Sequence, residues 1–345
     1  MSILEFKTTR KEWLKQSYAK AHNTGKLRES TIKHWDKFLA SINHNDEAVL
    51  MELRKNFNNP DAYVFLNRYV QYLIEKKLRR ASIVSSFSTL RSWCSANGIM
   101  LHNEFVKQFV KFPKDVKEIR HPLTPEIIQR LIDNSPTIVK SVLLCLLSSG
   151  MRVSECLALK VEDINQDVNP IELRLRAQNT KTKEERIAYI SSEAWMNVNN
   201  LIKNKGPDDY VFYDDKTRYP LESFEIRFAR VRVKAELIQK YDSGLYKVNI
   251  HAFRAYFHTQ ATKTLGGDTA HALLGHHAYL DQYFRLSNDE KSEMYHKLEP
   301  FLTVDNTQRQ KAIIEDKDKQ LKEVEILKEE MKKMQAQIQR ANDKK

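Results

Sequence analysis

The chain has 345 residues and a mass of 40.6 kDa, which is too long for one typical core and predicts two domains. Only 8 glycines and 9 prolines are present, which excludes collagen-like and low-complexity chains and favours a mainly helical protein. The formal charge of +12 is almost wholly N-terminal: residues 1–120 hold 22 Lys and Arg against 12 Asp and Glu. Such an excess favours a polyanionic partner, most often nucleic acid, although a merely soluble basic domain is the alternative.

The sequence shows neither a targeting or membrane-spanning pattern nor a paired-cysteine pattern. The N-terminus lacks the charged and apolar regions of a secretory signal, and no apolar run approaches the roughly 18 residues of a membrane span. The three cysteines, Cys94, Cys145 and Cys156, lie too far apart in sequence for a disulfide framework or a zinc ribbon. We therefore expect a soluble, cytoplasmic, DNA-associated protein with no membrane partner.

The first predicted elements are amphipathic helices. Residues 29–42 carry apolar side chains at alternating spacings of three and four, which predicts a helix with Ser30 as its N-cap. Similar stretches follow at 62–73 and at 82–95, where Val84 and Trp93 are expected to share one apolar face. We interpret these aromatic stripes as core. The exposed cations between and beside them are the better phosphate contacts, namely Lys76, Lys77, Arg79, Arg80 and Arg91.

A change of pattern follows at residues 112–122, which have prolines near both ends and little periodicity and are predicted to form a linker. Thr124 as N-cap and Pro125 at the first helical position then begin a helix. An apolar helix over 137–149 is expected to end at Gly150. Residues 171–176 and 185–190 alternate in polarity around a polar stretch, which predicts a β-hairpin, and helices return from Ser192.

The C-terminal segment is highly charged and contains no glycine or proline from 307 to 341. Five apolar residues there step by three and four, as in a short coiled coil: Val324, Leu327, Met331, Met334 and Ile338. Because only about two heptads fit the repeat, a solvated single helix or a docking helix is the alternative.

Three islands carry the side chains that suggest chemistry. In the first, Arg152 follows a helix-ending glycine and has Glu155 three residues on. In the second, His251 and Arg254 are spaced to share one helical face and to converge on one phosphate. The third is Leu273–His277, which is followed by two tyrosines.

The order of these islands, with a lysine-bearing hairpin between the first two, resembles the tyrosine recombinase family of phage integrases, Xer and Cre. The resemblance covers residues from about 123 to 304, and Met294–Val304 is similar to the corresponding part of archaeal integrases. It implies a two-domain clamp on DNA, mainly α, with an α+β catalytic domain holding a small β-hairpin. The implied parts are a helical core-binding domain (1–111), a linker (112–122), a catalytic domain (123–304) and a charged tail (305–345).

The activity that the resemblance implies is site-specific DNA recombination or integration. Members of the family act as homotetramers on double-stranded attachment sites, cut and rejoin strands through a 3′-phosphotyrosyl bond, and use no metal or other cofactor. A type IB topoisomerase shares the same groups but needs no partner site. A non-catalytic DNA-binding descendant is the other alternative.

Site roles also follow from the resemblance. Arg152 and Arg254 match the arginines that clamp the phosphate, and Glu155 matches a supporting acidic position. His251 would assist proton transfer, and His276 would hydrogen-bond the phosphate. The hairpin lysine that protonates the leaving 5′-hydroxyl is matched best by Lys181 and second best by Lys183.

The nucleophile departs from the family pattern. The family's tyrosine lies nine residues after the histidine, where this sequence has Arg285. We expect Tyr283, seven residues after His276, to attack; Tyr279 is the second candidate and Tyr295 the third. The nearby His271, His276 and His277 could suggest zinc, but no cysteine or carboxylate completes the set, so no metal is expected.

Overall fold

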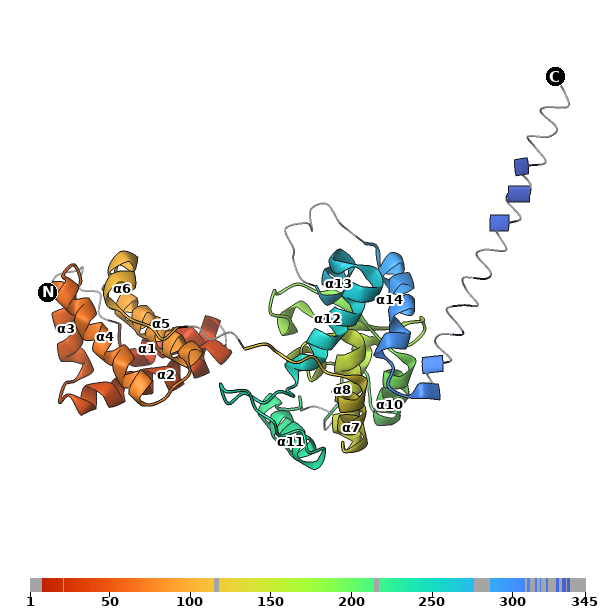
Figure 1. Ribbon diagram of the computed structural model, residues 1–345, viewed down its shortest axis with the longest axis horizontal. Coiled ribbons are helices and arrows are strands. Elements are labelled where there is room, and N and C mark those ends of the chain that lie inside the picture. Colours follow the sequence, from red (N-terminus) through yellow and green to blue (C-terminus); the bar gives the residue numbers. More distant parts are fainter. Residues whose placement is uncertain are drawn as a thin grey trace, which may run out of the picture. The chain divides into compact units, whose positions relative to one another are not determined.

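The computed structural model describes residues 8–20, 22–114, 118–213, 217–275 and 286–307, together with scattered residues between 309 and 335. The chain divides into two compact units, 1–118 and 119–345 (Figure 1). It is mainly helical with one small sheet, which confirms the expected fold class. Within the described ranges, no helix is both long and apolar enough to cross a bilayer.

The first unit is entirely helical in its described part. Its elements are α1 (Arg10–Lys20), α2 (His22–Ser41), α3 (Asp46–Asn56), α4 (Pro60–Glu75), α5 (Arg80–Ala96) and α6 (Asn103–Phe109). The predicted aromatic stripes form its core. Trp35 and Tyr69 are fully buried there in edge-to-face contact, with their ring centroids 5.0 Å apart. Asp46 satisfies the indole N–H groups of Trp35 and Trp93, which buries two polar tips without leaving a donor unpaired.

Two local predictions for this unit are wrong. Ser30 does not cap a helix, because α2 already begins at His22 and passes through it. Apolar residues spaced by three and four show which face of a helix is buried but not where the helix starts. The polar residues with which α2 begins were therefore not recognised as helical. Val84 is 38% exposed, although Phe87, Leu90 and Trp93 on the same helix are buried. The buried face of α5 runs through Ile83, Phe87, Leu90 and Cys94, and Val84 lies beside it, because repeated steps of three drift around a helix with about 3.6 residues per turn.

The cations at positions 76–80 lie in the turn between α4 and α5 and at the first residue of α5. Lys76, Lys77, Arg79 and Arg80 are all exposed there, as phosphate contacts require. Arg80 donates to the carbonyl of Pro113, and Arg91, which is half-buried, donates to Asn103 Oδ1 at 2.7 Å.

The second unit is built around α8 (Thr137–Ser149), in which every residue from Val142 to Ser149 is buried. The helices around it are α7 (Pro125–Asp133), α9 (Val153–Cys156), α10 (Ser192–Ile202), α11 (Leu221–Lys234), α12 (His251–Leu265), α13 (Gly267–Leu274) and α14 (Asn288–Leu302). Because α8 is apolar all round, it suits the centre of a core rather than its surface. Figure 1 shows it lying between α7, α10 and α12.

Two predicted helix boundaries in this unit, the start of α7 and the end of α8, are confirmed. Thr124 caps α7 with Pro125 at its first position, and the Thr124 side chain accepts from the amide of Ile127. Gly150 ends α8 in the left-handed region, with φ of +62°. A Cβ at Gly150 would lie 2.5 Å from a ring carbon of Phe257, so glycine is required there both by conformation and by space.

The sheet is antiparallel, in the order β1 (Ile164–Asn165), β2 (Ile171–Leu175), β3 (Arg186–Ile190). Strands β2 and β3 form the predicted hairpin, with Ile171 opposite Ile190 and Leu175 opposite Arg186. The two-residue strand β1 was not predicted, since so short a strand shows no alternation.

Candidate active site

Glu155 is the centre of the site. Its side chain is 1% exposed, and it ion-pairs with Arg152 at 2.8 Å and with Arg186 at 2.9 Å. It also accepts the backbone N–H of Arg152 at 2.8 Å, as the carboxylate of a capping box does at the start of α9. A buried carboxylate needs such partners, and here they come from α9 and from β3.

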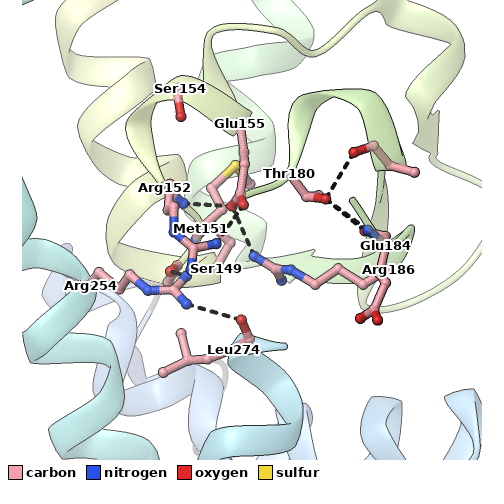
Figure 2. Close-up of polar contacts among 12 residues, drawn as sticks. Ser149, Met151, Arg152, Ser154, Glu155, Thr180, Glu184, Arg186, Arg254 and Leu274 are labelled. Carbon is pink, nitrogen blue, oxygen red and sulfur yellow. Dashed lines mark hydrogen bonds and ion pairs between the residues drawn. The ribbon is translucent and has the colours of Figure 1, made fainter. Parts of the chain in front are cut away.

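Arg254 reaches the same place from α12. It is 5% exposed, and its Nη1 and Nη2 donate to the carbonyls of Gly150 at 2.5 Å and Leu274 at 3.0 Å. Burial, followed by the charges of Arg152 and Arg186, lowers the pKa of Arg254 to about 10. Figure 2 shows the three guanidinium groups converging around Glu155.

An open cleft of about 540 Å³ brings Arg152, His251 and Arg254 together, and its lining also includes Ser154, Arg232 and Asn249. The first island, with Arg152, and the second, with His251 and Arg254, therefore line the same cleft. The spacing of His251 and Arg254 had predicted that these two side chains share a face. Three arginines around one carboxylate leave a local charge of about +2, which attracts an anion in a partly desolvated cleft.

His251 begins α12 at the edge of this cleft. The residue is exposed, but its ring is partly desolvated, and this lowers its pKa from 6.5 together with the charges of Arg254, Arg152 and Arg120. The imidazole is therefore neutral at pH 7 and able to accept a proton. Its position suits general acid–base chemistry on a group in the cleft.

The loop between β2 and β3 carries both candidate lysines. Lys181 and Lys183 are exposed, and Lys183 donates to the carbonyl of Gln178 at 3.2 Å. Thr180 holds the base of the loop: its hydroxyl donates to the carbonyl of Glu184 at 2.9 Å and accepts the amide of the same residue (Figure 2). The structure does not place either lysine in the lining of the cleft.

Several predicted site residues lie outside the described residues, namely His276, His277, Tyr279 and Tyr283. Tyr295 is described, and it does not suit a nucleophile. It is 1% exposed, its hydroxyl donates to the carbonyl of Ser148 at 2.8 Å, and burial raises its pKa well above 10. Its role is to pack α14 against α8.

Two residues near the site were missed by the sequence analysis. Arg186 was covered there only by the predicted strand at 185–190, and Arg120 only by the predicted linker at 112–122. Arg186 could have been found, because an arginine in the strand Arg186–Ile190, which is otherwise apolar, needs a buried partner. Arg120 gave no such signal, since its influence on His251 depends on how the chain folds back.

Comparisons with known proteins agree on one family. Residues 121–282 match the model described as the phage integrase family. Tyrosine recombinase XerC of Staphylococcus aureus (strain MSSA476) is 26% identical over 286 residues, which cover 79% of this chain and 91% of the relative. XerC of Halalkalibacterium halodurans is 28% identical over 152 residues, covering 41% of this chain and 48% of the relative.

Solved structures show the same fold. A lambda integrase dimer bound to a COC′ core site matches with a TM-score of 0.52 and 18% identity, covering 81% of this chain and all of the other. A lambda integrase tetramer bound to a Holliday junction matches with the same score and identity, covering 82% of each chain.

Proposed function

The chain belongs to the tyrosine recombinase family of site-specific recombinases, and we propose that it cuts and rejoins duplex DNA through a 3′-phosphotyrosyl intermediate. The observation that carries this proposal is the convergence of Arg152, His251 and Arg254 on one cleft, with Arg152 held by the buried carboxylate of Glu155. These groups offer the positive charge and the proton acceptor that phosphoryl transfer requires.

The first chemical step is an in-line displacement at phosphorus. The phenolic oxygen of Tyr283 forms a bond to the scissile phosphorus as the bond to the 5′-oxygen breaks. His251 takes the phenolic proton, directly or through water, and Lys181 gives a proton to the leaving 5′-oxygen. Charge that gathers on the nonbridging oxygens is stabilised by the guanidinium groups of Arg152 and Arg254, with His276 donating a further hydrogen bond.

Rejoining is the reverse of this step. The 5′-hydroxyl of a partner strand gives its proton to Lys181 and attacks the phosphotyrosine. The bond from phosphorus to the phenolic oxygen breaks, and the tyrosine takes a proton back from His251. The energy of the phosphodiester is kept in the covalent intermediate, so neither ATP nor another cofactor is consumed. The arginines supply the charge that a metal ion supplies in other phosphoryl transfer enzymes, and we propose that no metal takes part.

We propose double-stranded attachment sites as the substrate and a homotetramer on two such sites as the active assembly. The lambda integrase structures contain a core site in one case and a Holliday junction with a tetramer in the other. The N-terminal unit would bind the backbone through Lys76, Lys77, Arg79, Arg80 and Arg91. The charged tail, of which Val324 and Ile338 lie outside the described residues, would link protomers.

Strand transfer is the test. Plasmids carrying two copies of DNA that flanks the chain's own gene would be incubated with the protein in EDTA. Recombined circles support the proposal, since they require exchange between two sites. Relaxed circles without recombinants would indicate a type IB topoisomerase, and specific binding without any cut strand would indicate a non-catalytic descendant.

A further inference from the structure

Arg186 occupies a junction between three separate parts of the chain. It is the first residue of β3, and its side chain is 14% exposed. Its Nη2 pairs with Glu155 at 2.9 Å, and its Nη1 donates to the carbonyl of Leu273 at 3.4 Å. A Cβ at Gly275 would lie 2.4 Å from Cδ of Arg186, so the side-chain stem packs directly against that turn.

Each contact leads to a different group of the proposed reaction. Glu155 holds Arg152 by its backbone and by its guanidinium. The turn at Leu273–Gly275 directly precedes His276 in sequence. Arg186 itself ends the loop that carries Lys181. We propose that Arg186 is a positioning residue for DNA cleavage, one that aligns these three segments without touching the reacting atoms.

The energetics explain why an arginine is needed at this position. Burial lowers the pKa of Arg186, and the nearby charge of Arg152 lowers it further, while Glu155 raises it. A buried guanidinium beside other cations stabilises the fold little compared with an apolar side chain. What it does provide is a rigid planar fork that bonds two partners in fixed directions, which the single ammonium of lysine does not.

The same hairpin offers a matched control. Arg176 follows β2, and its Nε pairs at 2.6 Å with Asp163, a carboxylate that is 1% exposed like Glu155. Its Nη2 pairs with Glu162. Neither partner lines the cleft, so Arg176 provides the same kind of ion pair away from the site.

The test compares Arg186→Lys with Arg176→Lys, because both substitutions keep the charge and remove the fork. Single-turnover cleavage would be measured on a nicked suicide duplex that the wild type cleaves, together with the dissociation constant for intact DNA. We expect Arg186→Lys to cleave about a hundredfold more slowly, as misplacement of reacting groups by about 1 Å does, with DNA binding roughly unchanged. Arg176→Lys is expected to cleave at the wild-type rate.

Hydrogen exchange gives a readout that needs no DNA. In Arg186→Lys, the amides of Leu273–Gly275 and of Arg152 should exchange faster than in the wild type, while in Arg176→Lys they should not. If Arg186→Lys unfolds, Arg186→Gln replaces it, since its shorter neutral amide avoids a buried charge and cannot bond both partners of the arginine. We expect this variant to cleave slowly as well.

The proposal rests on the proposed function, and the two can fail separately. The positioning role would be overturned if Arg186→Lys cleaved at the wild-type rate. It would also be overturned if Arg186→Lys were slowed no more than Arg176→Lys. So would unchanged exchange at both segments, or wild-type cleavage by Arg186→Gln. If the wild type forms no adduct on any duplex, the recombinase mechanism fails, and the exchange data alone decide whether Arg186 holds these segments.

Discussion

Glu155 holds Arg152 at two points: one carboxylate oxygen accepts its backbone N–H and the other accepts its Nη1, each at 2.8 Å. The guanidinium that we assign to the phosphate is thereby fixed in both position and direction before any substrate arrives. The oxygen that accepts the backbone N–H also accepts a hydrogen bond from Nη2 of Arg186. A single buried anion therefore organises the cations of the site.

Replacing Glu155 by glutamine tests this arrangement. Glutamine keeps the shape but removes the charge, and its amide turns a donor toward one of the two arginines. We expect the free energy of unfolding to fall by about 3–5 kcal/mol, the cost of breaking a buried pair from one side. Urea unfolding followed by circular dichroism measures it.

Glu162→Gln is the control for that experiment. Its carboxylate also pairs with an arginine but is 40% exposed, so we expect a loss of about 1 kcal/mol or less. Equal losses in the two variants would contradict the central place of Glu155.

Arg254→Lys removes a fork that spans two carbonyls from different segments. A buried lysine beside Arg152 and Arg186 has a lowered pKa and loses its charge near neutrality, whereas the arginine, with a pKa of about 10, keeps it. Cleavage should fall by about a hundredfold or more. Because protonation restores the charge, the deficit should shrink as the pH falls from about 8.5 to about 7. A constant deficit across this range would contradict the account.

The pH dependence of cleavage follows from His251. Its lowered pKa means that the neutral, proton-accepting form persists below pH 6.5, so the second-order rate constant for cleavage should fall only at lower pH. In Arg120→Gln one of the depressing charges is gone, and the acid limb should move up toward 6.5. Lys263→Gln, which removes a charge from the far end of α12, should leave the limb in place. The same shift in both variants would exclude a specific effect of Arg120.

Lys181 is tested by changing the leaving group. Lys181→Ala should cleave ordinary DNA about 10² to 10⁴ times more slowly, the range typical of a lost general acid. With sulphur in place of the bridging 5′-oxygen, the leaving thiolate needs no proton, and the variant should approach the wild-type rate. Lys183→Ala should behave like the wild type on both substrates. The reverse pattern would assign the proton to Lys183.

Much of the fold could be predicted from local signals. The apolar run at 137–149 and Gly150 identified the central helix and its end, because a left-handed C-cap has a strong residue preference. The hairpin followed from alternation, and the shared face of His251 and Arg254 followed from helical spacing. These features depend on neighbours in sequence, so the sequence alone reveals them.

The rest of the site depends on contacts between distant residues. Arg186 meets Glu155 across 31 positions, and Arg120 influences His251 through a fold that no local pattern encodes. Tyr295 illustrates the converse. Its position in sequence allowed a catalytic role, and only the bond to Ser148, 147 positions away, shows that it belongs to the core.

The most direct test of the proposed mechanism is to trap the covalent intermediate in EDTA. Nicked suicide duplexes tiled from the DNA beside the gene would be incubated with the protein, and the peptide joined to the 3′-phosphate would be identified by mass spectrometry. We predict an adduct on Tyr283 that is absent from Tyr283→Phe and retained by Tyr279→Phe. An adduct on Tyr279 would contradict the assigned nucleophile, and specific DNA binding without any adduct would contradict phosphotyrosine chemistry.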